Sequence, residues 1–347
     1  MTVVFRVRAA ASLAAVLLAA LLTACAEPAP PPPPPPPPPV ALSPKLVEQA
    51  SAYRRYMSET TAISPDFVDG AAVGRSLMTG VGYEPQHLLR GAIAYSAIVA
   101  LQDPAFLAGV RAYAADPGAR QVVADGILKD PAYVVGIAGS ASAAGLITTA
   151  LGNEGRGLWD SGKRVKQAAY DVQHSPWSKA DVPNRMGRLA QAKTLSATPL
   201  AGDVMETLRL QQAVNGAGAL GIAGPASTPP YTPLVIRGLA LAALAVLGEA
   251  DDAHLDRALS VMSEPMSANC LNMSKLNLYQ CLAVSKPYYE DVFCLGQHAM
   301  IDTGQCLTRG AGLPDPIDIK TTPLTIAASD PLVAATRKST AKTPPAN

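Results

Sequence analysis

The sequence predicts an all-α protein, a multi-helix globular domain that ends in a helical hairpin stapled by disulfides. Prolines that follow a polar capping residue recur along the chain, and apolar residues repeat after them at helical spacing. Hydrophobic residues make up 49% of the chain but aromatic residues only 5%, so alanine and other small side chains must pack the helices closely. Four cysteines lie together in the C-terminal part of the chain, between Cys270 and Cys306.

Residues 1–24 have the features of an export signal. Arg6 and Arg8 supply a positively charged start, and the uncharged run from Ala9 to Leu22 is too short to span a membrane comfortably as a permanent helix. We therefore expect this signal peptide to be cleaved from the mature chain.

The end of this signal, Leu22-Thr23-Ala24-Cys25, resembles the lipobox of bacterial lipoproteins, and the resemblance covers only this region. It implies that Cys25 receives a diacylglyceryl group and becomes the N-terminus, acylated with fatty acids such as palmitate. Ala26 stands where an Asp would indicate retention at the inner membrane, so the implied location is the periplasmic face of a Gram-negative outer membrane. The alternative is an ordinary cleaved signal followed by an incidental cysteine.

A lipid-anchored tether is expected over residues 25–42. Its ten consecutive prolines, Pro30 to Pro39, predict a polyproline II rod roughly 30 Å long, at about 3.1 Å per residue. The favoured interpretation is a spacer that holds the folded domain away from the bilayer. Recognition of the prolines by an aromatic-lined groove stays open as the alternative.

Residues 43–225 are expected to form an N-terminal helical domain. A polar residue followed by proline is typical of a helix start, because the polar side chain caps the helix and proline lacks the amide hydrogen that would otherwise be unpaired. The sequence predicts longer helices after Ser64-Pro65 and Glu84-Pro85. Shorter ones of about three turns are expected after Asp103-Pro104, Asp116-Pro117 and Asp130-Pro131, and a first helix after Ser43-Pro44.

The uncharged stretch 131–153 predicts a buried helix with a face of small residues, spaced by four at Gly136, Ser140 and Ala144. Such a face over 136–150 is also a candidate for self-association. The following segment, 152–199, is more polar and rich in turn residues, with one helical piece expected at 162–173.

A stretch rich in glycine and proline around residues 215–233 is the best internal boundary, which we place near residue 225. A C-terminal helical region is then expected at 226–330, with the apolar run Leu239 to Leu247 as a core helix. A single core shared by both halves remains the alternative. Residues 331–347 are small and polar and predict a disordered, solvated tail.

Apart from Cys25, the four remaining cysteines predict disulfides, because an exported chain with an even number of them is typical of oxidised pairs, and their spacing is too wide for zinc. Cys270 and Cys281 lie on one expected helix about 16 Å apart, too far to bond. An antiparallel second helix after Lys286-Pro287 would pair Cys281 with Cys294 and Cys270 with Cys306. The crossed pairing, Cys270 with Cys294 and Cys281 with Cys306, stays open as the alternative.

Recognisable catalytic or cofactor motifs are absent from the sequence, and we predict no cofactor and no metal site. Loss of Arg6 and Arg8 lowers the 28 basic residues to 26, against 27 acidic ones, so nucleic acid is not an expected partner. The weak catalytic candidates are His298, Asp302 four residues later, and Glu290 and Asp291 two turns before. A surface ion pair is the favoured interpretation of His298 and Asp302.

These observations predict a non-enzymatic, outer-membrane-anchored periplasmic lipoprotein that acts as a binding or scaffolding component of the cell envelope. Its expected partners are the membrane, through the N-terminal lipid, and an envelope protein or the cell wall. The alternative is an envelope hydrolase or metal-dependent enzyme that uses the Glu290–Asp302 region.

Overall fold

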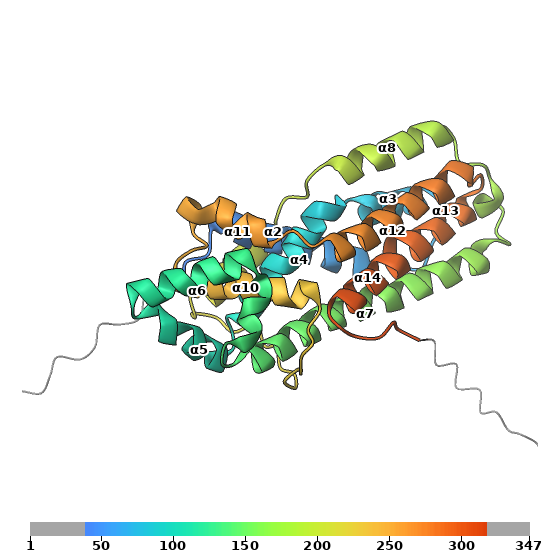
Figure 1. Ribbon diagram of the computed structural model, residues 1–347. Helices are drawn as coiled ribbons and strands as arrows, with labels where there is room; N and C mark the ends of the chain where they lie inside the picture. The colour runs from blue at the N-terminus through green and yellow to red at the C-terminus, as the bar shows by residue number, and fades with distance from the viewer. Residues whose placement is uncertain (1–38, 318–347) are drawn as a thin grey trace, which may run out of the picture. The chain divides into compact units, whose positions relative to one another are not determined.

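A computed structural model describes residues 39–317 of the chain (Figure 1). The expected signal peptide, Cys25, all but the last proline of the tether and the expected tail at 331–347 lie outside the described residues. The described part contains thirteen α-helices and no β-strand, which confirms the all-α prediction.

Six of these helices begin with a proline that follows a side-chain cap. Ser43 Oγ accepts a hydrogen bond from Lys45 N at 3.2 Å, and Asp103 Oδ1 accepts one from Phe106 N at 2.7 Å. The predicted starts at residues 44, 85, 104 and 117 are confirmed. The six helices are α2 (Pro44–Thr61), α4 (Pro85–Ala100), α5 (Pro104–Ala114), α6 (Pro117–Lys129), α10 (Pro233–Leu247) and α12 (Pro265–Val284).

The helix expected after Ser64-Pro65 begins later than predicted. Asp66 N donates a hydrogen bond to Ser64 Oγ at 3.1 Å, so the serine closes a local turn instead of capping a helix. Helix α3 (Gly70–Val81) starts after Asp69, whose Oδ1 accepts a bond from Ala72 N at 2.7 Å. Ser64 and Asp69 can both cap a helix, so the prediction placed the helix start at the wrong one of the two.

A second correction concerns residues 131–173. After Asp130-Pro131 the chain forms only the 3₁₀ helix η1 (Pro131–Gly136), and Gly139, at φ 83°, redirects it. Helix α7 (Ser140–Val172) then runs unbroken through the stretch where the sequence predicts turns and a short helix at 162–173. The glycines of this stretch lower its helix propensity, but packing holds it helical.

The C-terminal segment folds as the predicted hairpin. Helix α12 is followed by α13 (Tyr288–Cys294), by a π-helix η4 (Leu295–Ile301) and by α14 (Asp302–Gly310). Disulfides join Cys270 to Cys306 and Cys281 to Cys294, each with Cα atoms 5.7 Å apart. The structure therefore confirms the nested pairing and excludes the crossed one.

Glycines explain how α7 packs against this hairpin. A Cβ atom on Gly304 would lie 2.7 Å from the carbonyl oxygen of Gly155, and one on Gly296 would lie 3.0 Å from that of Gly162. No larger residue fits between backbones this close. Helices α7 and α14 consequently run side by side along the lower edge of the molecule in Figure 1.

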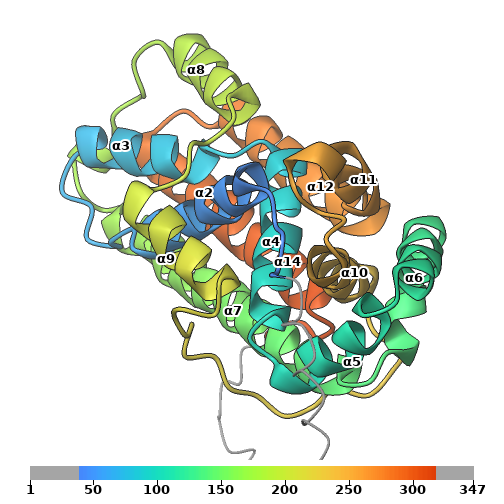
Figure 2. The same ribbon diagram turned by 90° about the vertical axis from the view of Figure 1, so that its left-hand side faces the viewer.

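The middle of the chain contributes short helices and the predicted core helix. Every residue from Leu239 to Leu247 is buried in α10, which lies between α4 and α6 (Figure 2). The remaining elements are η2 (Trp177–Lys179), α8 (Arg185–Ala197), α9 (Val204–Val214), η3 (Asp252–His254) and α11 (Leu255–Val261).

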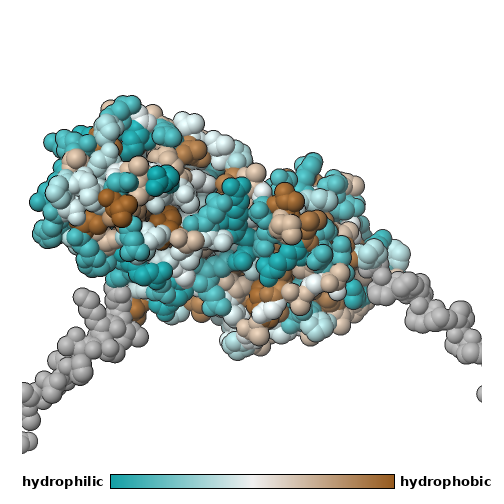
Figure 3. Space-filling view, turned by 180° about the vertical axis from the view of Figure 1, so that it is seen from behind, coloured by the Kyte–Doolittle hydropathy of each residue, from teal (hydrophilic) through white to brown (hydrophobic). Residues whose placement is uncertain are grey.

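Residues on both sides of position 225 belong to one hydrophobic cluster, so the two halves share a core. Of the predicted small-residue face, Gly136 lies in η1, outside α7, whereas Ser140 and Ala144 are buried in this core. Beside them, a Cβ atom on Gly145 would lie 1.9 Å from Pro225 O. That face is therefore covered by the chain itself. On the molecular face in Figure 3, hydrophobic and hydrophilic residues are interspersed.

A search of residues 39–317 for membrane-spanning segments finds no single helix of sufficient length and apolarity. Helices α4 and α5 meet the criteria of length and composition only when taken together, and the chain bends by 89° between them.

Candidate functional site

The four weak catalytic candidates occupy three different surroundings. Glu290 and Asp291 lie on α13, His298 lies in the π-helix η4, and Asp302 begins α14. In the part of the chain that the structure describes, no three His, Cys, Asp or Glu side chains are grouped so that they could hold a metal ion. These residues therefore do not converge on a single reaction centre.

Asp291 is engaged in a buried ion pair. Arg188 on α8 donates hydrogen bonds to both carboxylate oxygens of Asp291 and also to the carbonyl oxygen of Leu282. Ser285 Oγ donates a further bond to Asp291 at 2.7 Å. Burial raises the pKa of Asp291, and the charge of Arg188 opposes that rise. The pair joins α8 to α13, and the bond to Leu282 adds the end of α12, which is a structural role.

His298 and Asp302 form the predicted side-chain pair, with Nδ1 and Oδ2 2.8 Å apart. Both side chains are about one-fifth exposed, and Gln297 Nε2 donates a second hydrogen bond to Asp302 at 2.8 Å. Lys166 Nζ in turn donates to Gln297 Oε1 at 2.7 Å. The π-helix thus presents a linked row of polar groups, and π-helical segments are rare and are frequently found at functional sites.

Beneath this row lies a buried hydroxyl network. Ser274 Oγ donates to the carbonyl oxygen of His298 at 2.7 Å and lies 2.9 Å from Thr303 Oγ1. The hydroxyl of Tyr83 lies 3.0 Å from the same threonine oxygen. Burial raises the pKa of Tyr83 to about 12, so its hydroxyl stays protonated near neutral pH. These bonds tie α12 and α14 to the segment before α4.

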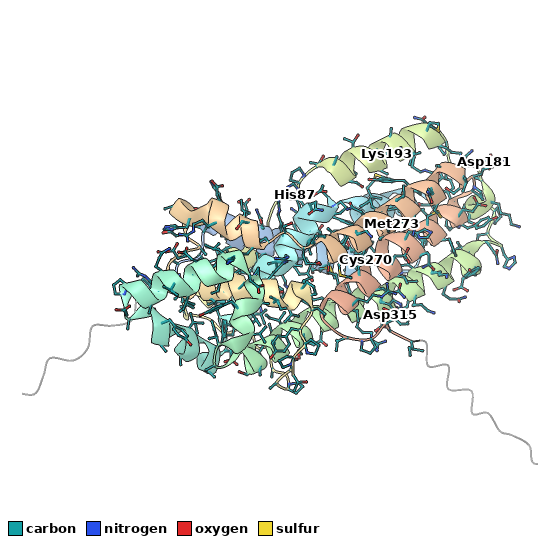
Figure 4. The ribbon with its side chains drawn as sticks, viewed as in Figure 1. His87, Asp181, Lys193, Cys270, Met273 and Asp315 are labelled. Carbon is teal, nitrogen blue, oxygen red and sulfur yellow. A yellow bond between two sulfur atoms is a disulfide. The ribbon has the colours of Figure 1, made fainter. Side chains whose placement is uncertain are left out.

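A groove of about 590 Å³ runs between α12 and α14 over the Cys270–Cys306 disulfide. Asp302 and Arg309 contribute charge to its lining, and the exposed Met266 and the half-exposed Met273 contribute apolar surface. Figure 4 shows Cys270 and Met273 on α12, close to α14. Arg309 is already paired with Asp315, at 2.5 Å, so the groove offers no free cation.

The second disulfide lies beside a smaller cavity of about 370 Å³, which we call the aromatic recess. It lies between the last turn of α7 and the turn from α12 into α13. Its defining side chains are Tyr170, Gln173, Tyr289, Glu290 and Phe293. The rings of Tyr170 and Phe293 lie 6.3 Å apart at 79°, so they form a corner rather than a stack.

The aromatic recess and the start of the described chain lie at opposite ends of α7. Pro39, at the start of the described chain, lines a cavity together with Pro104 of α5. Gly139, just before α7, packs on Phe106, which is also on α5. These contacts place Pro39 at the N-terminal end of α7. Tyr170 is thirty residues beyond Ser140, or about 45 Å along the helix at about 1.5 Å per residue. Asp181, whose neighbour Val182 bonds Lys286 beside the recess, marks that far end in Figure 4.

Comparison with known proteins gives no relative: no family model, no curated protein and no solved structure matches the chain. The chemistry of its surface must therefore be argued from its own residues.

Of the four weak catalytic candidates, only Glu290 lines the aromatic recess, beside the paired Cys281 and Cys294. Tyr170 and Gln173 come from the end of α7, and Tyr289 and Phe293 from α13, so more than a hundred residues separate the two contributions. The available signal was the clustering of aromatic residues in a chain with only 5% of them. The sequence did not show that α7 reaches this point, because its glycines predict turns.

Proposed function

We propose that this protein is a lipid-anchored component of a bacterial outer membrane whose helical domain binds a cell-envelope partner in the periplasm. The lipobox-like residues that end at Cys25 support the anchor, and the ten prolines support a spacer. The observation that carries the binding role is the position of the aromatic recess, about 45 Å along α7 from the end of the domain that joins the tether.

The anchor is tested by Cys25→Ser. The variant lacks the thiol to which the diacylglyceryl group would attach, so it should leave the outer-membrane fraction or accumulate with its signal uncleaved. The measurement is cell fractionation followed by mass spectrometry of the N-terminus. Equal recovery of variant and natural protein in the outer membrane would contradict the proposal.

The binding role is tested by photo-crosslinking in living cells. Val284, at the rim of the aromatic recess, is 74% exposed, and Val122 on α6 is similarly exposed at 69% but does not line the recess. A photoreactive residue at position 284 should trap an envelope component that the same residue at position 122 does not. The yield should fall when Tyr170→Ala is added. Identical products from both positions would contradict a specific site.

An envelope hydrolase is the second candidate, and the bonded pair of His298 and Asp302 is the observation in its favour. Asp302 lines the groove over the Cys270–Cys306 disulfide, which would be the substrate site. Hydrolysis of isolated cell-wall material by the purified protein, lost in His298→Gln, would favour this function over the binding role.

A further inference from the structure

The polar groups of the aromatic recess are available to a ligand. The side chains of Gln173 and Tyr289 line the cavity and make no hydrogen bond within residues 39–317. Glu290 Oε2 accepts one bond, from Lys286 N at 2.7 Å. A carboxylate offers about four acceptor positions, so Glu290 retains capacity for a ligand.

The carboxylate limits which ligands fit. A carboxylate only accepts hydrogen bonds, so a ligand that covers Glu290 should donate them to its remaining acceptor positions, which would otherwise lose water without replacement. A polyproline segment has no N–H group, and an acyl chain has no donor at all. The prolines of the tether and the lipid anchor are therefore poor occupants of this recess.

The charges around the recess favour a neutral ligand. Lys166 Nζ lies 5.1 Å from the ring centroid of Phe293, so one face of that ring already carries an ammonium group. The recess thus has a positive group, Lys166, over one of its rings and a negative group, Glu290, in its lining. An anion would meet the carboxylate, and a cation would compete with Lys166 for the aromatic surface.

The rings supply flat apolar surfaces beside these hydrogen-bonding groups. Tyr170 is 47% exposed, its ring stands at 79° to that of Phe293, and Tyr289 also lines the cavity. A ligand with both C–H faces and hydroxyl donors matches this combination. The volume of about 370 Å³ is near the lower end for small-molecule sites, which begin at about 300 Å³.

We propose that the aromatic recess binds pyranose rings of a glycan, which pack against Tyr170 and Tyr289 while their hydroxyl groups bond Glu290 and Gln173. The inference rests on the proposed function, because it names the ligand class of the same envelope-facing site. A glycan strand held in the recess would contact the end of α7 opposite to the end near Pro39.

The test is titration of the purified, signal-free domain, with its disulfides intact, against soluble probes by NMR spectroscopy or calorimetry. The probes are the β-linked disaccharide of N-acetylglucosamine, maltose, tetramethylammonium and a decaproline peptide. Binding of the first disaccharide alone supports an N-acetylated glycan, and binding of both supports recognition of the pyranose ring itself. Failure of both disaccharides at millimolar concentration, or preferential binding of either other probe, overturns the proposal.

Matched variants locate the binding. Tyr170→Ala and Glu290→Gln should each weaken the disaccharide at least tenfold, whereas Tyr113→Ala, an exposed tyrosine on α5, should leave it unchanged. Circular dichroism checks that each variant remains folded. Equal affinity in Tyr170→Ala and Tyr113→Ala would overturn the assignment to the recess.

The two proposals fail separately. If the disaccharides do not bind but Cys25→Ser still releases the protein from the outer membrane, the glycan inference is wrong and the anchor stands. If Cys25→Ser changes nothing but the disaccharides bind at Tyr170, the recess is a glycan site on a protein that is not anchored in this way.

Discussion

The ammonium group of Lys275 lies 3.4 Å from the ring centroid of Tyr83 and donates a hydrogen bond to the carbonyl oxygen of Val81 at 2.9 Å. The lysine is 4% exposed and has no carboxylate within bonding distance in the described chain. Burial holds the pKa of Lys275 well below its usual value, and the charge of Glu84 opposes this only in part. The fold thus buries a lysine amino group whose main contacts are an aromatic ring and a carbonyl group.

We expect Lys275→Met to flatten the pH dependence of stability. The unfolded lysine titrates near about 10.4, above its pKa in the folded protein, so the unfolded state binds more protons between the two values. Stability of the natural protein should therefore rise with pH across that window, by up to about 1.4 kcal/mol per pH unit for this group. The measurement is the denaturant midpoint from pH 6 to pH 10.

The control for this experiment is Lys193→Met on α8. Lys193 also lies over a tyrosine ring, 5.8 Å from the centroid of Tyr279, but it is exposed. The Lys193→Met variant should show the same pH dependence of stability as the natural protein. A profile equally steep in Lys275→Met and in the natural protein would show that the buried lysine does not contribute to it.

Local signals in the sequence sufficed for several helix starts and for the disulfide pattern. The cap at Asp103 and the fixed backbone angle of the following proline depend only on neighbouring residues, so they act wherever the helix lies. The pairing of Cys281 with Cys294 follows from the rise of one helix and the turn after it.

The features that the sequence did not predict depend on contacts between segments that are far apart in the chain. Helix α7 continues through Gly155, where its backbone packs closely against that of Gly304, far along the chain. Helix propensity alone predicts a break at these glycines. Lys275 lies on the same helix face as Leu271, Leu278 and Leu282, but a lysine in such a stripe is usually expected to reach solvent. The aromatic recess was missed for the same reason, since Tyr170 reaches Phe293 only when α7 is unbroken.

Asp291→Ala should destabilise the protein strongly. The substitution leaves Arg188 buried without its carboxylate, and breaking a buried pair from one side costs about 3 to 5 kcal/mol. Asp315→Ala, which removes an exposed carboxylate from Arg309, should cost about 0 to 1 kcal/mol. Urea denaturation measures both. Similar losses in the two variants would contradict the structural role given to the Arg188 pair.

The two disulfides should contribute unequally to stability. Cys281 and Cys294 close a loop of 13 residues, and Cys270 and Cys306 one of 36, so the chain-entropy relation gives about 3 and about 4 kcal/mol respectively. We therefore expect the Cys270→Ala, Cys306→Ala double variant to unfold at lower denaturant than the Cys281→Ala, Cys294→Ala one. The opposite order would indicate that packing around the inner disulfide outweighs loop closure.

Gly304→Ala tests the close approach of α7 and α14. An added methyl group would lie 2.7 Å from Gly155 O and 2.8 Å from Trp159 N, and both are backbone atoms that cannot turn aside. Overpacking of this kind costs about 1 to 3 kcal/mol.

Gly74→Ala on α3 is the matched control, because nothing lies within 4 Å of its added methyl group. Alanine is favoured over glycine inside a helix by about 0.5 to 1 kcal/mol, so this variant should be stabilised while Gly304→Ala is destabilised. Thermal and denaturant unfolding of the two variants should shift in opposite directions. Stabilisation by both substitutions would mean that the two helices separate enough to admit a methyl group, and the glycine contacts would not explain why α7 stays helical.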